Sequence, residues 1–328
     1  MARVVAGGRL HAGFQNLSLA HPRLYGGIGV ALAEPRLVVE AEPAEGIDAE
    51  DGLAREYAAR AVDLLEVPGV RVSVPERLPR HVGLGSGTQL ALATYAAVAL
   101  AHGREPEVRA VAPALGRGGR SGVGVAAFEA GGFVVDAGHP TTRFTADRPA
   151  DGEWTVPAVL ARHAVPADWR FVLVVPAVDS GRSGDREDES MRTVVERADP
   201  GVADAIARVV LRELLPAVAT GEIERFGTAL ARVGRLNGTW YADEQGGVYR
   251  PPVGRIVETL SRSPVVYGAG QSSWGPTVYG VTHASEASAA REAAEEALRD
   301  ADVEGSVRIV AAANRGAVLG SDPEGPDD

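Results

Sequence analysis

The chain has 328 residues, enough for one large domain or two of ordinary size, and its 45% of hydrophobic residues is typical of a globular protein. The net charge of −11 disfavours binding to nucleic acid or to anionic membranes, and the absence of any run of roughly 18 apolar residues argues against a membrane span. There is no cysteine and all 33 basic residues are arginine, which excludes disulfides, thiolate catalysis, Schiff-base chemistry and a lysine-containing P-loop.

The first half of the chain alternates β-like runs, helices and glycine-rich turns. Apolar residues at helical spacing predict a helix over residues 51–66. The segment 83–103 opens with three glycines and continues as an alanine-rich helix that is apolar nearly all round, so we expect it to be buried. A second glycine-rich loop follows at 116–124. Strands are expected at residues 3–6, 28–33, 37–40, 70–74 and within 131–139.

The second half begins after a segment rich in Thr, Arg, Pro and Asp, residues 140–154, where we place the domain boundary. The expected domains are residues 1–150 and 151–320, followed by a disordered acidic tail at 321–328. Strands are expected at 170–175, 265–268, 277–281 and 307–311, and helices at 202–218, 222–236 and 285–301. Because strands and helices mix without strict βαβ alternation, the predicted fold class is α+β.

The first glycine-rich loop has the chemistry of a phosphate cradle. Glycine lets the backbone approach a ligand closely, and the helix that follows directs its N–H groups and its dipole toward an anion. The hydroxyls of Ser86 and Thr88 suit phosphate oxygens or a phosphate-bound Mg²⁺. The alternative is a plain loop with a helix cap. The residues expected to bind phosphate here are Gly83, Gly85, Ser86, Gly87, Thr88 and Gln89.

Two further glycine-rich loops need an explanation. In the second loop, Arg117 and Arg120 could each bind phosphate through two parallel hydrogen bonds, or could be ordinary surface arginines. In the third loop, residues 268–276, Trp274 is either a stacking surface for a ligand or a hydrophobic plug. The phosphate-binding candidates of the second loop are Arg117, Gly118, Gly119, Arg120, Ser121 and Gly122.

Taken together, the loops resemble a known family. "PRHVGLGSGTQLALA" resembles the first phosphate-binding motif of the GHMP kinases, and "VVYGAGQSSWGPTVYG" resembles their C-terminal glycine loop. With "GRGGRSGVGVAAFEAGGFVVDAGH", the motifs are more similar to β-ribofuranosylaminobenzene 5′-phosphate synthases, non-kinase members of that superfamily, over nearly all of residues 9–280. The resemblance implies a two-domain GHMP-kinase-like α+β fold, with an N-terminal ribosomal-protein-S5-like domain, a C-terminal ferredoxin-like domain and the active site between them.

The resemblance also implies a reaction. Phosphoribosyl pyrophosphate joins 4-aminobenzoate or 4-hydroxybenzoate, with loss of CO₂ and pyrophosphate, in methanopterin-type cofactor synthesis, and Mg²⁺ is the expected cofactor. Arg9 and His11 are candidate partners of the arene carboxylate, and His139 is a further catalytic candidate. Asp136 is a candidate for stabilising the ribose cation or for binding the metal with Ser86 and Thr88. The arene or ribose is expected near Gly270, Gln271, Ser272, Ser273 and Trp274, under a lid that contains Arg182 and Asp185.

Several alternatives stay open. His11 and His139 could be structural, and the charged run at 179–189 could be a solvated loop. Several GHMP kinases carry an Asp after Ser-Gly-Val, where this chain has Gly124, which disfavours but does not remove a small-molecule kinase. A silent paralogue that senses a nucleotide or a phosphoribosyl compound is the other alternative. The sequence does not choose between the benzoates, leaves a homodimer open, and agrees with a cytoplasmic location.

Overall fold

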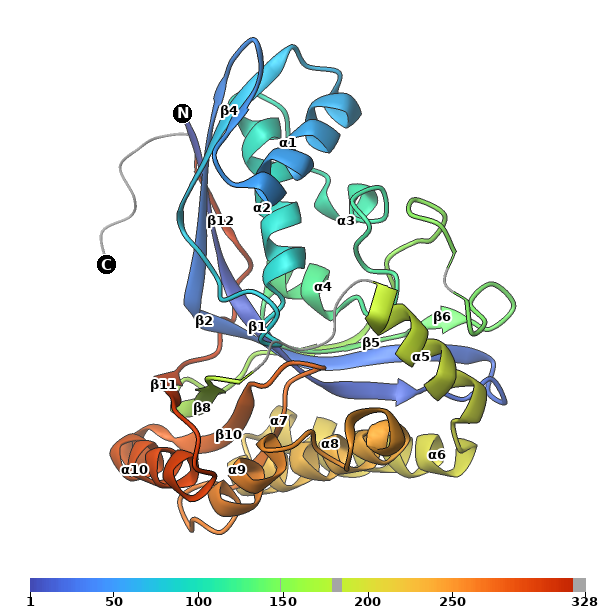
Figure 1. Ribbon diagram of the computed structural model, residues 1–328, viewed down its shortest axis with the longest axis vertical. Helices are drawn as coiled ribbons and strands as arrows, with labels where there is room; N and C mark the ends of the chain where they lie inside the picture. The colour runs from blue at the N-terminus through green and yellow to red at the C-terminus, as the bar shows by residue number, and fades with distance from the viewer. Residues whose placement is uncertain (148, 179–184, 321–328) are drawn as a thin grey trace.

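The computed structural model of the chain describes residues 1–147, 149–178 and 185–320 (Figure 1). Two β-sheets organise it, one in the upper and one in the lower part of the view, with helices packed against both. The α+β fold class is therefore confirmed. The predicted tail at 321–328 and the lid residue Arg182 lie outside the described residues, and for Asp185 only the backbone, the first residue of α5 (Asp185–Arg197), is described.

The first sheet is built on two long antiparallel strands, β1 (Ala2–Asn16) and β2 (Arg23–Pro43). The three short strands expected in this region are parts of them, and that expectation was wrong because glycines were taken as turns. A Cβ atom at Gly13 would lie 2.3 Å from Cγ of Asn237, so this glycine makes room for a packed neighbour inside a strand. The remaining strands of this sheet are β3 (Gly46–Ala49), β4 (Gly69–Glu76), β5 (Phe133–Asp136), β6 (His139–Pro140), β7 (Val159–His163) and β12 (Val318–Gly320).

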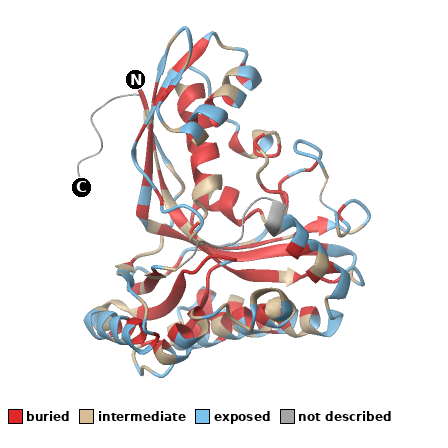
Figure 2. Ribbon diagram, in the orientation of Figure 1, coloured by how far each residue is buried: buried red, intermediate tan, exposed pale blue. Residues whose placement is uncertain are grey.

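Four helices of the first half lie on the same side of this sheet in Figure 1: α1 (Gly52–Leu65), α2 (Ser86–Ala101), α3 (Val108–Val111) and α4 (Val123–Ala130). The Asp51 carboxylate caps α1 by accepting a hydrogen bond from the Ala54 N–H at 2.8 Å. Helix α2 is buried along most of its length, as predicted, because it lies between α1 and strands β1 and β2 (Figure 2). This burial fixes the position of its N-terminus.

The second sheet is antiparallel in the order β11 (Gly305–Val310), β8 (Trp169–Pro176), β10 (Val278–His283), β9 (Gly268–Gln271). Helices α9 (Val253–Leu260) and α10 (Ala287–Asp300) share a core with it. A second core joins it to the lower half of the β1–β2 pair and to α6 (Pro200–Val209), α7 (Leu215–Thr220) and α8 (Ile223–Gln245). None of the helices in the described part of the chain is both long enough and apolar enough to cross a membrane.

The second half departs from expectation in four ways. The helix predicted at 202–218 is interrupted by a π-helical segment, Val210–Leu214. Helix α8 continues to Gln245 rather than ending at Leu236, and α9 was not predicted. The strand expected at 265–268 begins only at Gly268. The domain boundary near residue 150 stays a prediction; β7, which follows it, pairs with β5, and β12 pairs with β1, so late segments complete the first sheet.

Candidate active site

A large cavity of about 620 Å³ opens where the first and second glycine-rich loops meet. Five aliphatic side chains line it, Leu37, Leu53, Val74, Leu78 and Leu90. Most of the other described lining residues are polar or glycine. The sequence-predicted site residues that line the cavity are Arg9, His11, Gly83, Gly85, Ser86, Gly87, Thr88, Arg117, Gly118, Gly119, Arg120, Ser121 and Ser273.

The N-terminus of α2 forms part of the cavity wall. Gly83 and Gly85 adopt φ angles of +95° and +79°, the left-handed region that favours glycine, and this turn leads directly into the helix. No side chain in the described part of the chain caps α2, and the first intrahelical hydrogen bond runs from the Gln89 N–H to the Gly85 carbonyl at 3.0 Å. The first N–H groups of α2 therefore have no partner within the helix and suit an anion.

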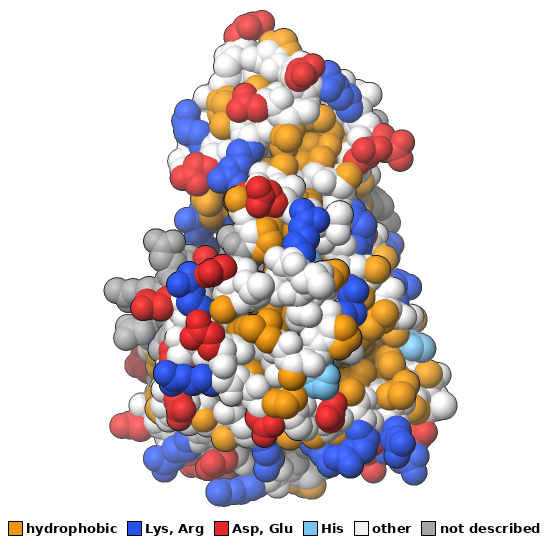
Figure 3. Space-filling view, turned by 90° about the vertical axis from the view of Figure 1, so that its right-hand side faces the viewer, with side chains coloured by type: hydrophobic (Ala, Val, Ile, Leu, Met, Phe, Trp, Pro, Cys, Tyr) orange, Lys and Arg blue, Asp and Glu red, His pale blue; other side chains and the backbone are white. Residues whose placement is uncertain are grey.

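Arginines dominate the charged part of the lining. Among the described residues, five arginines line the cavity, Arg9, Arg77, Arg80, Arg117 and Arg120, with a single acidic residue, Asp188. Arg77 and Arg80 both pair with the nearby Asp51 carboxylate and Arg120 pairs with Asp188, so these ion pairs offset part of the positive charge. On the face of the molecule shown in Figure 3, by contrast, arginine side chains are interspersed with aspartate and glutamate side chains. In a chain of net charge −11, the large cavity is thus a local site for an anion.

Each arginine of the predicted site is held in place by a neighbour. Arg9 donates from Nη1 to the Gly83 carbonyl at 2.6 Å. Arg117 stacks on the Tyr57 ring, with its Cζ 5.4 Å from the ring centroid, and donates a hydrogen bond to the Tyr57 hydroxyl. Arg120 forms an ion pair with Asp188 of α5. These contacts fix guanidinium groups around the α2 N-terminus before any ligand binds.

Asp136 does not line the large cavity; it is fully buried. Its Oδ2 accepts hydrogen bonds from the Gly122 N–H at 2.7 Å and the Ser121 hydroxyl at 3.2 Å, and its Oδ1 accepts from the Gly138 N–H at 2.9 Å. Burial raises the pKa of this carboxyl to about 6. The carboxyl group of Asp136 thus anchors the second loop from behind, and its predicted role at the ribose or a metal stays a prediction.

His139 and Gln89 also support the loops rather than line the cavity. The His139 ring stacks on Phe144 at a centroid distance of 3.7 Å, and its Nε2 lies 3.2 Å from the Gly118 carbonyl oxygen. Burial lowers the pKa of His139 to about 4, so the ring is neutral. Gln89 donates from Nε2 to the Gly124 carbonyl at 2.9 Å and thereby joins α2 to α4.

The third loop supports the first loop through Ser272. This buried hydroxyl donates to the Gly83 carbonyl at 2.7 Å and accepts from the His11 N–H at 3.1 Å. The neighbouring Ser273 donates its N–H to the His11 carbonyl at 2.9 Å and lines the large cavity. Gly270 lies beneath the ring of Tyr279, its partner across the β9–β10 pair. Of the third loop, only Ser273 reaches the large cavity.

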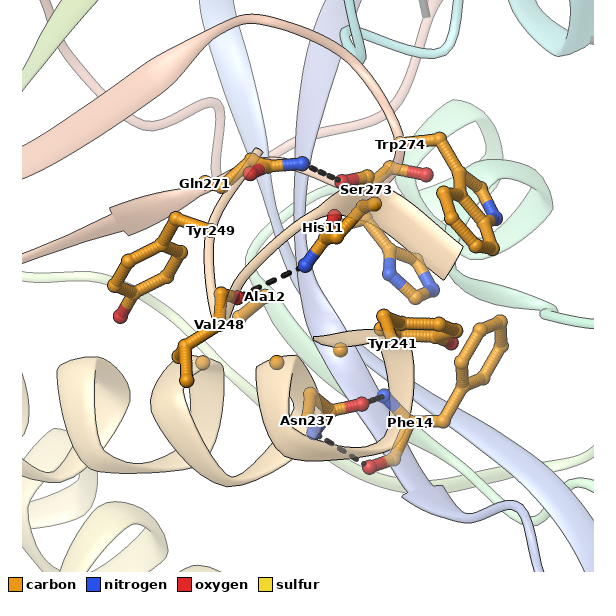
Figure 4. Close-up of a pocket in the computed structure, with 14 residues that line it drawn as sticks. His11, Ala12, Phe14, Asn237, Tyr241, Val248, Tyr249, Gln271, Ser273 and Trp274 are labelled. Atoms are coloured by element: carbon orange, nitrogen blue, oxygen red, sulfur yellow. Dashed lines mark hydrogen bonds between the residues drawn. The ribbon is translucent and has the colours of Figure 1, made fainter. Parts of the chain in front are cut away.

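A small pocket of about 40 Å³ adjoins the large cavity (Figure 4). The two share three lining residues, His11, Phe14 and Ser273. Figure 4 shows the rings of Phe14, Tyr241 and Trp274 gathered beside His11 at one end of the small pocket. The Trp274 ring lies 4.6 Å from that of Tyr241, centroid to centroid. Trp274 and Gln271 of the predicted arene side therefore line this small pocket and not the large cavity.

Helix α8 supplies the wall of the small pocket that sequence reasoning missed. Asn237 accepts from the Phe14 N–H at 2.7 Å and donates to the Phe14 carbonyl at 3.0 Å, which clamps α8 to β1. Gly234, Gly238 and Tyr241 line the same pocket. The spacing of Gly234, Asn237, Gly238 and Tyr241 places them on one helical face, and this was the available signal.

His11 lies where the two spaces meet. It is 4% exposed, and burial together with the nearby Arg9 lowers its pKa to about 3, so the imidazole is neutral at physiological pH. Its ring contacts Phe14 edge-on at 4.8 Å. The junction is therefore a buried and uncharged place beside a positively charged cavity.

Comparison with known proteins first defines the class. The sequence models for the GHMP kinases N terminal domain and the GHMP kinases C terminal family match residues 53–132 and 214–300. A homoserine kinase from Cytophaga hutchinsonii has 16% identity and a TM-score of 0.63, with 97% of each chain covered. A mevalonate pyrophosphate decarboxylase from Streptococcus pyogenes has 10% identity and a TM-score of 0.68, covering 96% of this chain and 97% of that one. The fold is thus that of the GHMP kinase superfamily.

Two relatives of higher sequence identity identify the family within this superfamily. The β-ribofuranosylphenol 5′-phosphate synthase of Methanothermobacter thermautotrophicus is 34% identical over 95% of this chain and 96% of its own length. The protein of that name from Archaeoglobus fulgidus is 32% identical over 86% of this chain and 88% of its own length. The chain therefore belongs to the β-ribofuranosylphenol 5′-phosphate synthase family of the GHMP kinase superfamily.

Proposed function

We propose that the chain transfers the phosphoribosyl group of phosphoribosyl pyrophosphate to 4-hydroxybenzoate with decarboxylation. The bond between the anomeric carbon and the pyrophosphate oxygen breaks, a C–C bond forms to ring carbon 1, and the bond from that carbon to the carboxylate breaks to release CO₂. The product is a ribofuranosylphenol 5′-phosphate, which agrees with the name of the family. The step belongs to methanopterin-type cofactor synthesis.

One observation carries the proposal: an anion cradle and an aromatic pocket meet at one buried, neutral histidine. The large cavity offers the α2 N-terminus, Arg9 and Arg117 to the phosphate groups, with Arg120 beside them in an ion pair with Asp188. The small pocket offers aromatic rings to a planar arene; because its volume of about 40 Å³ is below the roughly 150 Å³ of a benzene-binding cavity, the arene would also occupy the adjoining part of the large cavity. Because the two share His11, Phe14 and Ser273, the anomeric carbon and the arene can meet there. A site that only transferred phosphate would not need the aromatic pocket.

The residues at the junction suit the two bond changes. Arg9 and the N–H groups of α2 would hold the departing pyrophosphate, on which negative charge builds up. The neutral His11 adds no charge beside the ribose cation. Surrounded by buried rings, the arene carboxylate would be poorly solvated, and loss of neutral CO₂ relieves that cost.

Mg²⁺ is proposed as a companion of the substrate. Among the described residues, no group of three or more His, Asp or Glu side chains could hold a metal ion. The hydroxyls of Ser86 and Thr88 line the cavity and fit an ion that is bound mainly by the pyrophosphate. The ion would neutralise charge on the leaving group. The homodimer stays a prediction.

The experiment is to mix the protein with Mg²⁺ and phosphoribosyl pyrophosphate and to follow pyrophosphate release with and without 4-hydroxybenzoate. We expect release that depends on the arene. A kinase would instead convert ATP to ADP with an alcohol acceptor. The usual base is absent at Gly124, where a Cβ atom would already lie 3.1 Å from Cγ2 of Thr88, so an aspartate has little room. ADP formation without arene-dependent pyrophosphate release would contradict the proposal.

A further inference from the structure

Beside Gly234, which lines the small pocket, lies a buried hydroxyl group that needs a partner. Tyr279 of β10 is fully buried, and its ring extends over Gly270 toward α8. A Cβ atom at Gly270 would lie 2.6 Å from the Tyr279 hydroxyl oxygen, so only glycine leaves room for the ring. Within the described part of the chain, this hydroxyl makes no hydrogen bond. A buried polar group without a partner is costly, and such groups are uncommon in folded proteins.

Three polar atoms converge on the space above Gly234 of α8. A Cβ atom built on Gly234 would lie 3.4 Å from the Tyr279 hydroxyl oxygen, 3.9 Å from the Tyr249 hydroxyl oxygen and 3.9 Å from the Ala12 carbonyl oxygen. Gly234, Tyr249 and Ala12 line the small pocket. In Figure 4, Tyr249 lies at the opposite end from Phe14 and Trp274. This end of the small pocket therefore brings two hydroxyls and a carbonyl close to a helix position that carries no side chain.

We propose that Tyr249 and Tyr279 bind the 4-hydroxyl group of the arene and thereby select 4-hydroxybenzoate over 4-aminobenzoate. This inference rests on the proposed function. The 4-hydroxyl and ring carbon 1 lie at opposite ends of the ring. With the hydroxyl at Gly234, carbon 1 and its carboxylate face His11, Phe14 and Ser273, where the large cavity begins. The orientation that satisfies the buried hydroxyls is also the reactive one.

The selection follows from hydrogen-bond chemistry. Arg235 can only donate hydrogen bonds, so its hydrogen bond to the Tyr249 hydroxyl leaves the hydrogen of that hydroxyl available to another acceptor. A phenol oxygen can accept that hydrogen and donate its own to Tyr279 or to the Ala12 carbonyl. An arylamine offers two donors, but its nitrogen lone pair is delocalised into the ring. It would leave the Tyr249 donor without an acceptor, and buried sites discriminate strongly against such a ligand.

The first test uses Tyr279→Phe and Tyr249→Phe, with Tyr267→Phe as the control. The Tyr267 hydroxyl donates to Glu286 at 2.5 Å and lines neither the large cavity nor the small pocket. For Tyr279→Phe we expect kcat/KM for 4-hydroxybenzoate to fall about tenfold or more relative to 4-aminobenzoate. Its unfolding midpoint should stay unchanged or rise, because the lost hydroxyl had no protein partner. The control should keep the substrate preference.

The second test adds a side chain at Gly234. The contacts of a Cβ atom at Gly234 are at ordinary van der Waals distances, so Gly234→Ala should fold normally. It should lose 4-hydroxybenzoate binding in calorimetry and retain that of unsubstituted benzoate, whereas Gly52→Ala, with no atom within 4 Å, should bind both as the parent does. If the parent is active and both Tyr279→Phe and Gly234→Ala keep its preference for 4-hydroxybenzoate over 4-aminobenzoate, the inference is overturned. A parent that binds no arene and releases no pyrophosphate would instead refute the proposed function, and the inference with it.

Discussion

At the residue scale, Arg117 and Gly87 are matched to each other. A Cβ atom at Gly87 would lie 3.4 Å from Nη1 of Arg117, so the glycine leaves the guanidinium directly against the start of α2. Tyr57 holds the other side of the guanidinium by stacking and by its hydroxyl. Arginine held in this way can present two parallel donors to a phosphate without first losing side-chain freedom. We therefore regard Arg117 as the main phosphate contact of the second loop.

Arg117→Ala should weaken phosphoribosyl pyrophosphate binding by roughly 10- to 150-fold, since a hydrogen bond to a charged group contributes about 1.5–3 kcal/mol. Arg117→Lys should recover only part of the affinity, because the ammonium keeps the charge and loses the planar fork. Titration calorimetry at fixed salt measures both. Arg232→Ala is the control, since Arg232 pairs with Glu213 on the exposed side of α8. Parent-like binding by both Arg117 variants would remove this residue from the site.

The kinds of residue at this site could be predicted from the sequence, but the contacts that several of them make could not. Except for Gly122, the glycines and arginines of the first two loops that are predicted to bind phosphate line the large cavity. Asp136 and His139 were expected at the substrate because titratable groups beside glycine-rich loops suggest chemistry. The chain gives no local sign that the Gly122 and Gly138 N–H groups bind the Asp136 carboxylate. Which polar group binds the backbone and which binds the ligand is decided by tertiary contacts.

At the element scale, the three loops form one supported structure. The third loop holds the first through Ser272, and β5 holds the second through Asp136. Helix α8 is clamped to β1 by Asn237, which brings Tyr241 beside Trp274. The loops were predictable because glycines and hydroxyl residues stand out in the sequence. The Ser272 contact and the α8 wall were not, because they join residues more than 180 positions apart.

Ser272→Ala tests this support. The substitution leaves the His11 N–H and the Gly83 carbonyl without the hydroxyl that joins them. We expect the free energy of unfolding to fall by about 1–3 kcal/mol, measured by urea denaturation. Phosphoribosyl pyrophosphate affinity should fall less than in Arg117→Ala, because Ser272 supports the first loop without lining the cavity. Unchanged stability with abolished substrate binding would show that Ser272 contacts the substrate instead.

At the scale of the whole molecule, buried titratable groups make stability depend on pH. His11 and His139 have pKa values lowered to about 3 and about 4, so the unfolded chain binds two protons near pH 5 that the folded chain does not. Their contribution is lost as pH falls below about 6.5. Asp136, with its pKa raised to about 6, acts in the opposite sense, and its contribution is lost as pH rises through about 4 to 6.

The two histidines destabilise the fold as pH falls and the one aspartate stabilises it. Together, these three groups lower the free energy of unfolding by about 1.4 kcal/mol for each unit that the pH falls between pH 6 and 4. His139→Gln should remove most of that slope, and Asp136→Asn should roughly double it. Urea denaturation of the parent and both variants at pH 4.5, 5.0, 5.5 and 6.0 gives the slope of the unfolding free energy against pH for each protein. All other titratable groups are the same in the three proteins, so differences between the slopes come from the substituted residue. Slopes that do not move in opposite directions would contradict the assigned protonation states.

The central claim for the whole molecule is that one cavity and one adjoining pocket carry out a decarboxylating transfer. The most direct measurement is release of labelled CO₂ from carboxyl-labelled 4-hydroxybenzoate, compared with pyrophosphate released in the same reaction. We predict that labelled CO₂ appears only when phosphoribosyl pyrophosphate and Mg²⁺ are present, and in a one-to-one ratio with pyrophosphate. Pyrophosphate release with the label retained in the product, or no release of label in the complete mixture, would contradict the account.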